Sequence, residues 1–575
     1  MQNADLARLF SEIADLLEIK GENPFRVRAY RRAAEGLEGL TEDVGAVAAR
    51  DGLEELQGIG KDLAGKIREA LATGSIEYLE DLRQQIPAGV VDLMGIQGVG
   101  PRTAQMLFQR AGVDSVEKLE ALAGAGKLAG LPGIKARTEQ NILKGIAVWK
   151  AGRERMPLGR ALALAEAIVG ALRALPGIAR IETAGSLRRM RETVKDIDIL
   201  ITAADGGPAM RAFTDLPNVV EVLARGETKS SVRLAEGIQA DLRVVEPEAF
   251  GSALQYFTGS KAHNIRVREL AVRKGFKLSE YGVFRVKDDR RVAGATEEEV
   301  YDALGLPLIP PELREDLGEV DAALEGRLPV LVDVGHIRGD LHCHTNWSDG
   351  KLTPDELVRA AKARGYEYVV IADHSRSSTV ANGLDAGRLG QQLELIEGLR
   401  RKVKGITILA GSEVDIRADG TLDFPDEVLA RLDVVVASVH SRFKQEQGAM
   451  TDRIVRALRN PHVRILGHAT GRLLGEREPY AVDMEAVLAA ARDAGVAVEI
   501  NASPQRLDVN DLHARRAREL GLMMAVNTDA HAEAHLEFMR LGVAVARRAW
   551  LGPDAILNTR STRDLLAWLR RSPQH

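Results

Sequence analysis

Three aspartates in the middle of the chain have the residue type and spacing that metal-dependent phosphoryl transfer requires. Asp196 and Asp198 are two residues apart in the segment DIDILIT, which has a strand pattern, so both side chains should point to one face of a sheet. Asp241, in the segment ADLRVV, can reach that face from a neighbouring strand. Three such carboxylates can hold two divalent ions about 4 Å apart, which activate an attacking hydroxyl and neutralise a triphosphate.

A phosphate-binding segment precedes these aspartates. Gly185 and Ser186 are expected to open a helix, whose free N–H groups suit a phosphate, and Arg188 and Arg189 supply cations. Two aspartates in one strand are common and could simply face solvent. Their combination with a Gly-Ser pair, two arginines and a distant third aspartate is far more specific, and it indicates a phosphoryl-transfer site.

Histidine is concentrated in the C-terminal part of the chain. Of the 12 histidines, only His263 lies before residue 336, so the last segment should perform different chemistry. One histidine at a strand end is usually a hydrogen-bonded polar residue, whereas ligands that recur through a barrel pattern indicate two or three metal ions, and imidazole and carboxylate suit Zn, Mn or Fe. The candidate ligands are His342, His344, Asp349, His374, Glu413, His440, His468, Asp529 and His531.

Three N-terminal segments share a glycine turn followed by a helix: LQGIGKDLAGKI, IQGVGPRTAQML and LPGIKARTEQNIL. The pairs Gly58/Gly60 and Gly98/Gly100 permit a tight turn, after which the helix offers N–H groups to a phosphate. This helix-hairpin-helix pattern predicts sequence-independent DNA binding. The third copy has Lys135 in place of its second glycine, so we expect it to be structural.

The spacing from Gly60 to Lys66 also fits a nucleotide-binding P-loop. Ile67 occupies the position of the metal-binding Ser or Thr, however, and no strand pattern precedes the glycines. We therefore exclude an ATPase.

The elements that must position these residues form several domains, since 575 residues correspond to about four. Glycine-rich helical patterns are followed by a mixed α+β region. Beyond residue 336, short strands such as YVVIAD, VVVASVH and VAVEIN alternate with helical patterns, which predicts a parallel α/β barrel with polar residues at its strand ends.

Charge and composition give weaker guidance. The net charge is -5, but residues 101–191 hold 16 Lys and Arg against 7 Asp and Glu, which suits either a phosphate backbone or a solvated helical surface. Cys343, the single cysteine, excludes an internal disulfide and favours a reducing cytoplasm. Neither a signal peptide nor a membrane-spanning run is visible.

Residues 1–315 resemble the family X DNA polymerases, the group that includes DNA polymerase beta. AGSLRRMRETVKDIDILIT, YFTGSKAHN and GFKLSEYGVF carry this resemblance. It implies that the three aspartates are catalytic ligands of Mg or Mn. It also implies that Ser186 and Arg189, beside Gly185 and Arg188, contact the triphosphate of an incoming nucleotide.

The YFTGS motif assigns further residues through this resemblance. Tyr256 and Phe257 would form the sugar-gating face with the Gly259 backbone beside it, and Asn264 would lie at the minor-groove edge of the base. Arg268 matches a template-side arginine. The sequence departs from the family pattern at Lys195, Lys261 and Ile265, which concerns nucleotide affinity and fidelity rather than the reaction.

The segment RVRAYRRAAEGL resembles the family's small domain that grips the 5′-phosphate of a DNA gap. Arg26, Tyr30 and Arg31 would form that phosphate site. Lys66 aligns with the family's lyase lysine, which attacks an abasic sugar to form a Schiff base. A lysine on a DNA-facing helix is more often only a phosphate contact, so both roles stay open.

From GDLHCHTNWSDG onward, about residues 336–575 resemble a PHP domain (polymerase and histidinol phosphatase), with every family ligand position occupied. The resemblance implies phosphoesterase chemistry with two or three Zn or Mn ions. Fused to a polymerase, such a site is expected to act on DNA ends, as a 3′–5′ exonuclease, a 3′-phosphatase or an abasic-site endonuclease.

These observations predict a bacterial repair enzyme, a monomer in the cytoplasm near the nucleoid, that binds gapped or primer-template DNA and dNTPs and no membrane. The expected order is a small helical DNA-end-binding domain (1–85), fingers with a helix-hairpin-helix (86–150), a nucleotidyltransferase palm (151–260), a thumb (261–315), a linker (316–335) and a PHP barrel of about seven strands (336–575).

Two rival functions remain. A PHP phosphatase for small phosphorylated metabolites, tethered to DNA by an inactive polymerase-like region, would hydrolyse histidinol phosphate without incorporating nucleotides. A non-catalytic DNA-binding module would bind DNA without turnover. The intact aspartate triad argues against the first, and the complete set of metal-ligand candidates argues against the second.

Overall fold

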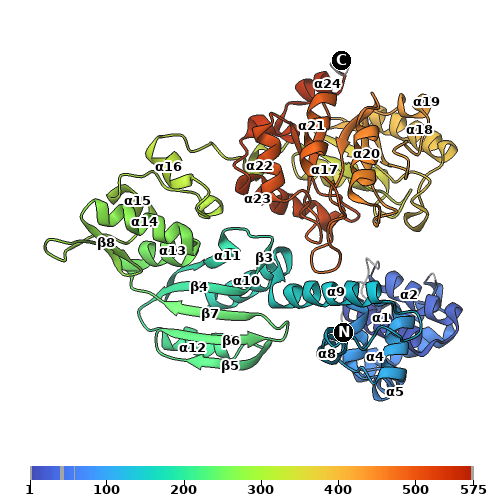
Figure 1. Ribbon diagram of the computed structural model, residues 1–575, viewed down its shortest axis with the longest axis horizontal. Coiled ribbons are helices and arrows are strands. Elements are labelled where there is room, and N and C mark those ends of the chain that lie inside the picture. Colours follow the sequence, from blue (N-terminus) through green and yellow to red (C-terminus); the bar gives the residue numbers. More distant parts are fainter. Residues whose placement is uncertain (1–2, 39–43, 57, 97, 571–575) are drawn as a thin grey trace. The chain divides into compact units, whose positions relative to one another are not determined.

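The computed structural model describes residues 3–38, 44–56, 58–96 and 98–570 (Figure 1). The chain divides into two compact units, Met1–Gly152 with Gly475–Arg477, and Arg153–Leu474 with Glu478–His575. The first is helical, and the second combines α+β parts with a parallel barrel, as the sequence predicts. Among the described residues, no helix is both long and apolar enough to cross a membrane.

The helices of the first unit share one buried apolar core, which runs from Leu6 to Ile146 across the domain boundary expected near residue 85. The helices are α1 (Asn3–Lys20), α2 (Pro24–Glu38), α3 (Val44–Ala49), α4 (Lys61–Thr73), α5 (Glu77–Gln85), α6 (Ala88–Asp92), α7 (Pro101–Ala111), α8 (Val116–Gly124) and α9 (Ala136–Glu154).

The two glycine hairpins have matching geometry. Gly58 and Gly98 have φ angles of 85° and 93°, in the left-handed region that favours glycine. Gly60 and Gly100 then cap α4 and α7 without a side-chain hydrogen bond, so backbone N–H groups at these helix starts remain available. Among the described residues before α4, a 3₁₀ turn at Gly52–Glu55 stands where a P-loop would have a strand, which agrees with the exclusion of a P-loop.

A five-stranded sheet lies in the segment expected to be the palm, with the order β2-β4-β7-β6-β5. Ile197, Ile199 and Ile201 of β4 are buried in a core that also includes side chains of α10 and α12. Alternation along the strand therefore turns Asp196 and Asp198 to the opposite face. The elements are β1 (Met156–Pro157), α10 (Leu158–Arg173), β2 (Ile178–Thr183), α11 (Gly185–Arg188), β3 (Thr193–Val194), β4 (Asp196–Ala203), α12 (Gly207–Thr214), β5 (Val219–Arg225), β6 (Lys229–Leu234), β7 (Gln239–Val244) and α13 (Phe250–Thr258).

The thumb and the segment that follows it share a core. Val267 of the thumb lies in one buried cluster with Val320 and Ala323, so the expected linker 316–335 is a packed bridge to the barrel. The elements are α14 (Lys261–Arg273), β8 (Phe276–Ser279), β9 (Gly282–Arg285), β10 (Arg291–Ala293), α15 (Glu297–Ala303) and α16 (Glu319–Leu324).

The C-terminal part is a parallel sheet in the order β11-β12-β13-β14-β15-β16-β17, which confirms the expected seven strands. It nearly closes into a barrel, because the backbone N–H of His344 bonds the carbonyl of Ala530 at 2.8 Å. The strands are β11 (Gly339–Cys343), β12 (Tyr368–Ile371), β13 (Thr407–Asp415), β14 (Val434–Ser438), β15 (Val463–Leu466), β16 (Ala497–Asn501) and β17 (Met524–Asn527).

Helix α24 (Thr562–Leu569) covers the amino-terminal strand ends, where its Leu565 and Trp568 pack with Tyr368 and Val434, each the first residue of its strand. The opposite end is thereby left for polar residues. The other helices are α17 (Pro354–Ala363), α18 (Ala386–Lys402), α19 (Asp426–Leu429), α20 (Gln447–Leu458), α21 (Met484–Ala494), α22 (Asp511–Glu519) and α23 (Met539–Arg548).

A buried ion network joins palm and thumb. Arg314 is fully buried, donates its Nε to the carbonyl of Ile309 at 2.8 Å and pairs with Glu297. Both oxygens of Glu297 also accept from Arg188, at 2.9 and 2.7 Å. Breaking such a network leaves a charge without its counterion in the interior.

We expect Glu297→Gln to lower the thermal midpoint of unfolding, because two guanidiniums lose their only shared anion at a cost of about 3 kcal/mol. Circular dichroism on the full chain measures the change. The control is Glu298→Gln, which neutralises an exposed neighbour on the same helix. Equal midpoints for the two variants would contradict a stabilising role for this network.

Candidate catalytic and metal-binding sites

The three aspartates predicted to bind metal lie on one face of the palm sheet. Strands β4 and β7 run parallel with Asp198 directly opposite Asp241, and Asp196 lies two residues earlier on β4. Gln239 donates Nε2 to Oδ1 of Asp241 at 2.8 Å, and Lys229 Nζ lies 3.2 Å from its Oδ2. The structure thus brings all three carboxylates together.

Like charges crowd this cluster. Burial, and then the negative charges of Asp196 and Asp241, raise the pKa of Asp198 to about 7, against the weaker effects of Arg243 and Lys229. A divalent cation would lower this pKa again, because it would pair with the ionised carboxylates. The donor set therefore fits metal ions.

Gly185 lets the start of α11 approach Asp198 closely. Its φ is +66°, and a β-carbon there would lie 2.6 Å from Asp198 Oδ2. Any side chain would strain the backbone and displace the carboxylate. Helix α11 begins at Gly185 and Ser186 follows it, so the Gly-Ser pair opens a short helix beside the aspartates.

The two arginines that follow are held by carboxylates rather than free. Arg188 is bound to Glu297, as described above, and Arg189 donates Nε to Glu315 at 2.9 Å and a second N–H to the carbonyl of Thr258 at 2.7 Å. The N–H groups in these contacts can bind phosphate only after the contacts break. Local sequence patterns did not reveal these carboxylates, because they lie 109 and 126 residues away.

The residues of the YFTGS segment meet where palm and thumb join. The rings of Tyr256 and Phe257 are edge to face, with centroids 5.1 Å apart. Asn264 donates to the carbonyl of Tyr256 at 2.6 Å, and a β-carbon at Gly259 would lie 2.4 Å from Asn264 Oδ1. One turn along α14, exposed Arg268 donates to the carbonyl of Asn264 at 3.2 Å.

A cavity of about 370 Å³ lies beside this junction. Its lining includes Lys229, Arg243, Phe257 and Tyr281. The Arg243 guanidinium stacks 4.5 Å from the centroid of the Phe257 ring. Our sequence analysis missed Arg243, although its position two residues after Asp241 on β7 places both side chains on one face.

In the first unit, Arg26 and Lys66 converge on Tyr78, which the sequence analysis did not identify. The Arg26 guanidinium lies 5.1 Å and Lys66 Nζ 5.6 Å from the Tyr78 ring centroid. Tyr30 is buried and stacks on Tyr78 at 6.4 Å. Arg31 lies apart from this group, since it pairs with two carboxylates of α1, Asp15 at 2.9 Å and Glu18 at 2.6 Å.

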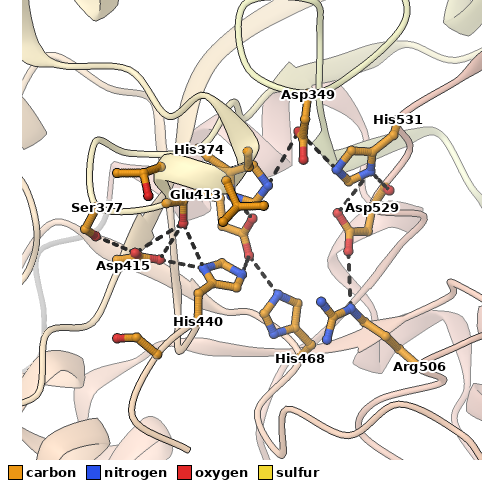
Figure 2. Close-up of a pocket in the computed structure, with 15 residues that line it drawn as sticks. Asp349, His374, Ser377, Glu413, Asp415, His440, His468, Arg506, Asp529 and His531 are labelled. Carbon is orange, nitrogen blue, oxygen red and sulfur yellow. Dashed lines mark hydrogen bonds and ion pairs between the residues drawn. The ribbon is translucent and has the colours of Figure 1, made fainter. Parts of the chain in front are cut away.

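The nine candidate ligands of the C-terminal part converge at the carboxyl ends of the barrel strands. Figure 2 shows seven of them around one pocket. Three groups each offer atoms within 4.8 Å of one another, the arrangement that a metal ion requires. The groups are His344, Asp349, His374 and His531; His342, His344, Glu413 and Asp529; and His374, Glu413 and His440. His468, the ninth, contacts Glu413 at 2.8 Å.

Glu413 lies at the centre of this cluster. Five imidazoles contact its carboxylate, among them His344, whose Nε2 lies 3.6 Å from Oε2. Its Oε2 lies 2.9 Å from His374 Nδ1 and 3.4 Å from His342 Nε2. Its Oε1 lies 3.3 Å from His440 Nε2 and 2.8 Å from His468 Nε2. A carboxylate with different neighbours on its two oxygens can bridge two metal ions.

Several buried ligand atoms here lie close to one another without the geometry of a hydrogen bond: His342 Nε2, His344 Nε2, Glu413 Oε2 and Asp529 Oδ1. Buried polar atoms are nearly always satisfied in native proteins, and exceptions require an explanation. Unused lone pairs on imidazole and carboxylate are what a transition metal or zinc would bind. The donor set fits such ions.

The charges also favour ligation. Burial and the neighbouring His531 and His374 lower the pKa of His344 to about 3, so this imidazole is neutral near pH 7 and its lone pair is available. Burial opposes ionisation of Glu413, but His440 and His374 hold its pKa well below the ordinary value.

Supporting residues escaped the sequence analysis. Glu499 accepts from His342 Nδ1 at 2.7 Å, and Asp415 bonds His440 Nδ1, so both orient ligands. Asp415 could have been found, because it follows Glu413 by two residues on one strand. Arg506 also lines the pocket, with Nε 3.6 Å from Asp529 Oδ2 (Figure 2).

The pocket has a volume of about 340 Å³. The loop Ser377–Ala381 also lines this pocket. Val380 of this loop is fully exposed, at 104%. The pocket is thus lined by the charged metal-ligand candidates and by one exposed apolar residue.

Family models match four stretches of the chain. They are a helix-hairpin-helix domain over residues 1–76, a helix-hairpin-helix tandem over 90–147, a DNA polymerase beta thumb over 253–315 and a PHP domain over 340–503.

Curated relatives match either the whole chain or one of its parts. The chain is 40% identical to the "DNA polymerase/3′-5′ exonuclease PolX" of Bacillus subtilis over 576 residues, which covers 100% of both proteins. A probable phosphatase of Thermoanaerobacter is 31% identical over 231 residues, 38% of this chain and 89% of the relative. DNA polymerase lambda of Rattus norvegicus is 26% identical over 343 residues, 54% of this chain and 56% of the relative. With the helix-hairpin-helix units, the palm aspartates and the histidine-lined barrel end in one chain, this protein belongs to the bacterial family X DNA polymerases that carry a C-terminal PHP domain.

Proposed function

We propose that this chain fills gaps in DNA by template-directed synthesis, and that its barrel removes nucleotides from 3′ ends as a metal-dependent exonuclease. The observation that carries the synthesis proposal is the facing pair Asp198 and Asp241 on parallel strands, with Asp196 beside them. Glu413, which five imidazoles contact, supports the second site. Full-length identity to a relative named for both activities supports the combination.

In the polymerase site, Asp196, Asp198 and Asp241 would hold two Mg or Mn ions, which supply activation of the primer 3′-hydroxyl and charge neutralisation at the triphosphate. The chain's own residues do the positioning. Ser186 and the backbone N–H groups of α11 would bind phosphate oxygens. Arg189 would join them after it releases Glu315.

The palm–thumb junction would select the nucleotide. Tyr256 and Phe257 would contact the sugar of a bound dNTP, next to the Gly259 backbone. Asn264 is held by the carbonyl of Tyr256 and would reach the base from the minor-groove side, while exposed Arg268 would contact the template strand. Arg188 would act indirectly, because both of its terminal nitrogens donate to Glu297.

The first unit would bind DNA through its hairpins, since Gly58, Gly60, Gly98 and Gly100 leave helix N–H groups for the backbone phosphates. Arg26 and Lys66, which meet at Tyr78, would take the 5′-phosphate of a gap. Lys66 pairs with Asp62 at 2.6 Å, as the charged ammonium of a phosphate contact would. A lyase nucleophile at Lys66 would have to leave this pair and lose its proton. We propose that the protein acts as a monomer.

In the barrel, the nine ligands would hold two or three Zn or Mn ions, which supply hydroxide at neutral pH and stabilise charge on the phosphorus. Neutral His344 and ionised Glu413 are ready to bind metal. Arg506 Nε lies 3.6 Å from Asp529, a longer distance than a hydrogen bond, so the guanidinium could turn to the phosphodiester that is cleaved. Val380 at the wall offers an apolar surface to a nucleobase.

A small-molecule phosphatase is the second candidate. It is favoured by relatives named as probable phosphatases, whose likeness covers only 33–40% of this chain. The same metal cluster could also remove a 3′-phosphate or cut beside an abasic site. Histidinol phosphate and a 3′-phosphorylated primer are therefore the comparison substrates.

A primer-extension experiment separates the two sites. On a one-nucleotide gap with a 5′-labelled primer and Mn²⁺, the wild type should extend the primer with dNTPs and shorten it without them. Asp198→Ala should lose extension by at least about a hundredfold and keep shortening, and His344→Ala should do the reverse, because each removes one metal ligand.

Absence of extension by the wild type would refute the polymerase proposal and favour the phosphatase. Extension without shortening would refute the exonuclease, and release of phosphate from the 3′-phosphorylated primer would then identify the barrel's substrate.

The crowded aspartates make a pH prediction. The folded-state pKa of Asp198 is about 7 against an ordinary 3.8, so its contribution to stability is present below pH 3.8 and lost as the pH rises through 7. In EDTA, Asp198→Asn should therefore be more stable than the wild type, and the difference should grow by roughly 2 kcal/mol between pH 5 and 7.5 after allowance for solvent screening.

Urea unfolding of both proteins at the two pH values measures this difference. Added Mn²⁺ should stabilise the palm of the wild type but not that of Asp198→Asn, so the difference in unfolding free energy between the two proteins should become smaller. A difference that is the same at both pH values would show that Asp198 is not crowded by its neighbours.

A further inference from the structure

A buried arginine of the barrel reaches the polymerase part of the same compact unit. Arg548, the last residue of α23, is 5% exposed. One N–H group donates to the backbone carbonyl of Arg189 and to Glu315 Oε1, both at 3.0 Å. Another donates to Asp511 of the barrel at 2.6 Å. Arg548 therefore contacts both the residue proposed to bind triphosphate and that residue's carboxylate partner.

Glu315 is shared between two guanidiniums. Its Oε1 accepts from Arg189 Nε at 2.9 Å and from Arg548, while the more exposed Arg191 lies 3.8 Å away. Burial opposes ionisation of Glu315, but Arg189 and Arg548 together lower its pKa. This carboxylate is thus ionised and enclosed, with one cation from the palm and one from the barrel.

An incoming triphosphate would compete with Glu315 for Arg189. If Arg189 turned to phosphate and no other cation were present, a buried carboxylate would lose its counterion, which is strongly unfavourable. Arg548 already holds the same oxygen and would remain there. Arg548 also donates to the carbonyl of Arg189, so the backbone of Arg189 can stay fixed while its guanidinium changes partner.

We propose that Arg548 is a positioning residue for nucleotide incorporation, which keeps Glu315 neutralised while Arg189 exchanges that carboxylate for the triphosphate of a dNTP. The inference rests on the polymerase function proposed above. It assigns the barrel a part in DNA synthesis that is separate from its own metal site.

A second contact ties the same loop to the barrel. Arg472 donates to Glu192, three residues after Arg189, at 2.7 Å, and its Nε donates to the carbonyl of Arg506 at 3.0 Å. The loop that carries Arg189 is therefore held at two points by the barrel. Arg472 would fix this loop, whereas Arg548 also contacts Glu315, the carboxylate that Arg189 would exchange.

Steady-state gap filling with varied dNTP tests the proposal. Arg548→Met keeps the length of the side chain but removes its charge, so it should raise the KM for dNTP about tenfold with kcat changed less than about twofold. Glu315→Gln in the Arg548→Met background should restore the KM to within about threefold of wild type, because Arg189 no longer leaves a carboxylate behind.

Arg540→Met is the matched control. Arg540 lies on the same helix and makes an exposed ion pair with Glu166 of the palm at 2.5 Å, without touching Arg189 or Glu315. It should leave the KM unchanged. Exonuclease activity should be unchanged in Arg548→Met, which also reports that the barrel has folded. If that variant does not fold, Glu315→Gln alone is measured, and it should lower the KM.

The outcomes are distinct. A wild type that incorporates no nucleotide refutes the proposed function. If the wild type does incorporate nucleotide, three results would overturn the role of Arg548. They are a normal KM in Arg548→Met, no recovery of the KM when Glu315→Gln is added to that variant, and an equal rise of the KM in Arg540→Met. If Glu315→Gln is the only folded variant, an unchanged KM overturns it too.

Discussion

The need to neutralise buried charge is the constraint on which the rest of the structure depends. An ionised group inside a protein is tolerated only when opposite charge and hydrogen bonds meet it. Arg314 is buried against Glu297, and Arg548 is buried against Glu315 and Asp511. Around Asp198 the protein supplies too little positive charge, and around Glu413 it leaves buried ligand atoms without hydrogen bonds. In both places a bound cation would supply the missing partner. Those two places are the proposed catalytic sites.

The two folds gather their ligands in different ways, and this separates two chemistries within one chain. In the palm, isoleucines fix one face of β4 in the core, so strand alternation presents the aspartates on the other face. In the barrel, ligands follow the carboxyl ends of successive parallel strands, while α24 covers the opposite end. Synthesis and hydrolysis of phosphodiesters can therefore use separate sets of metal ions. The contacts of Arg548 and Arg472 with the loop around Arg189 join these folds without merging their sites.

Much of this arrangement could be predicted from sequence, because its signals are local. The two-residue spacing of Asp196 and Asp198, the glycine hairpins and the strand-end histidines each depend on a few neighbouring positions. The partners of those residues could not be predicted in the same way. Glu315 and Glu297 meet the arginines of the Gly-Ser segment from more than a hundred residues away, and Glu499 meets His342 across 157 positions. Only the tertiary fold brings such pairs together. It also shows that Arg31 is engaged with Asp15 and Glu18, whereas Tyr78 joins Arg26 and Lys66.

Anomalous X-ray diffraction from crystals of the protein soaked in MnCl₂ tests the central claim, two separate metal-dependent sites in one chain, most directly. The account predicts Mn peaks in both places: between Asp196, Asp198 and Asp241, and around Glu413 among the barrel histidines. In crystals of Asp198→Ala, the palm peaks should disappear while those of the barrel remain. Peaks at only one site in the wild type, or loss of both sets in the variant, would contradict two independent catalytic centres.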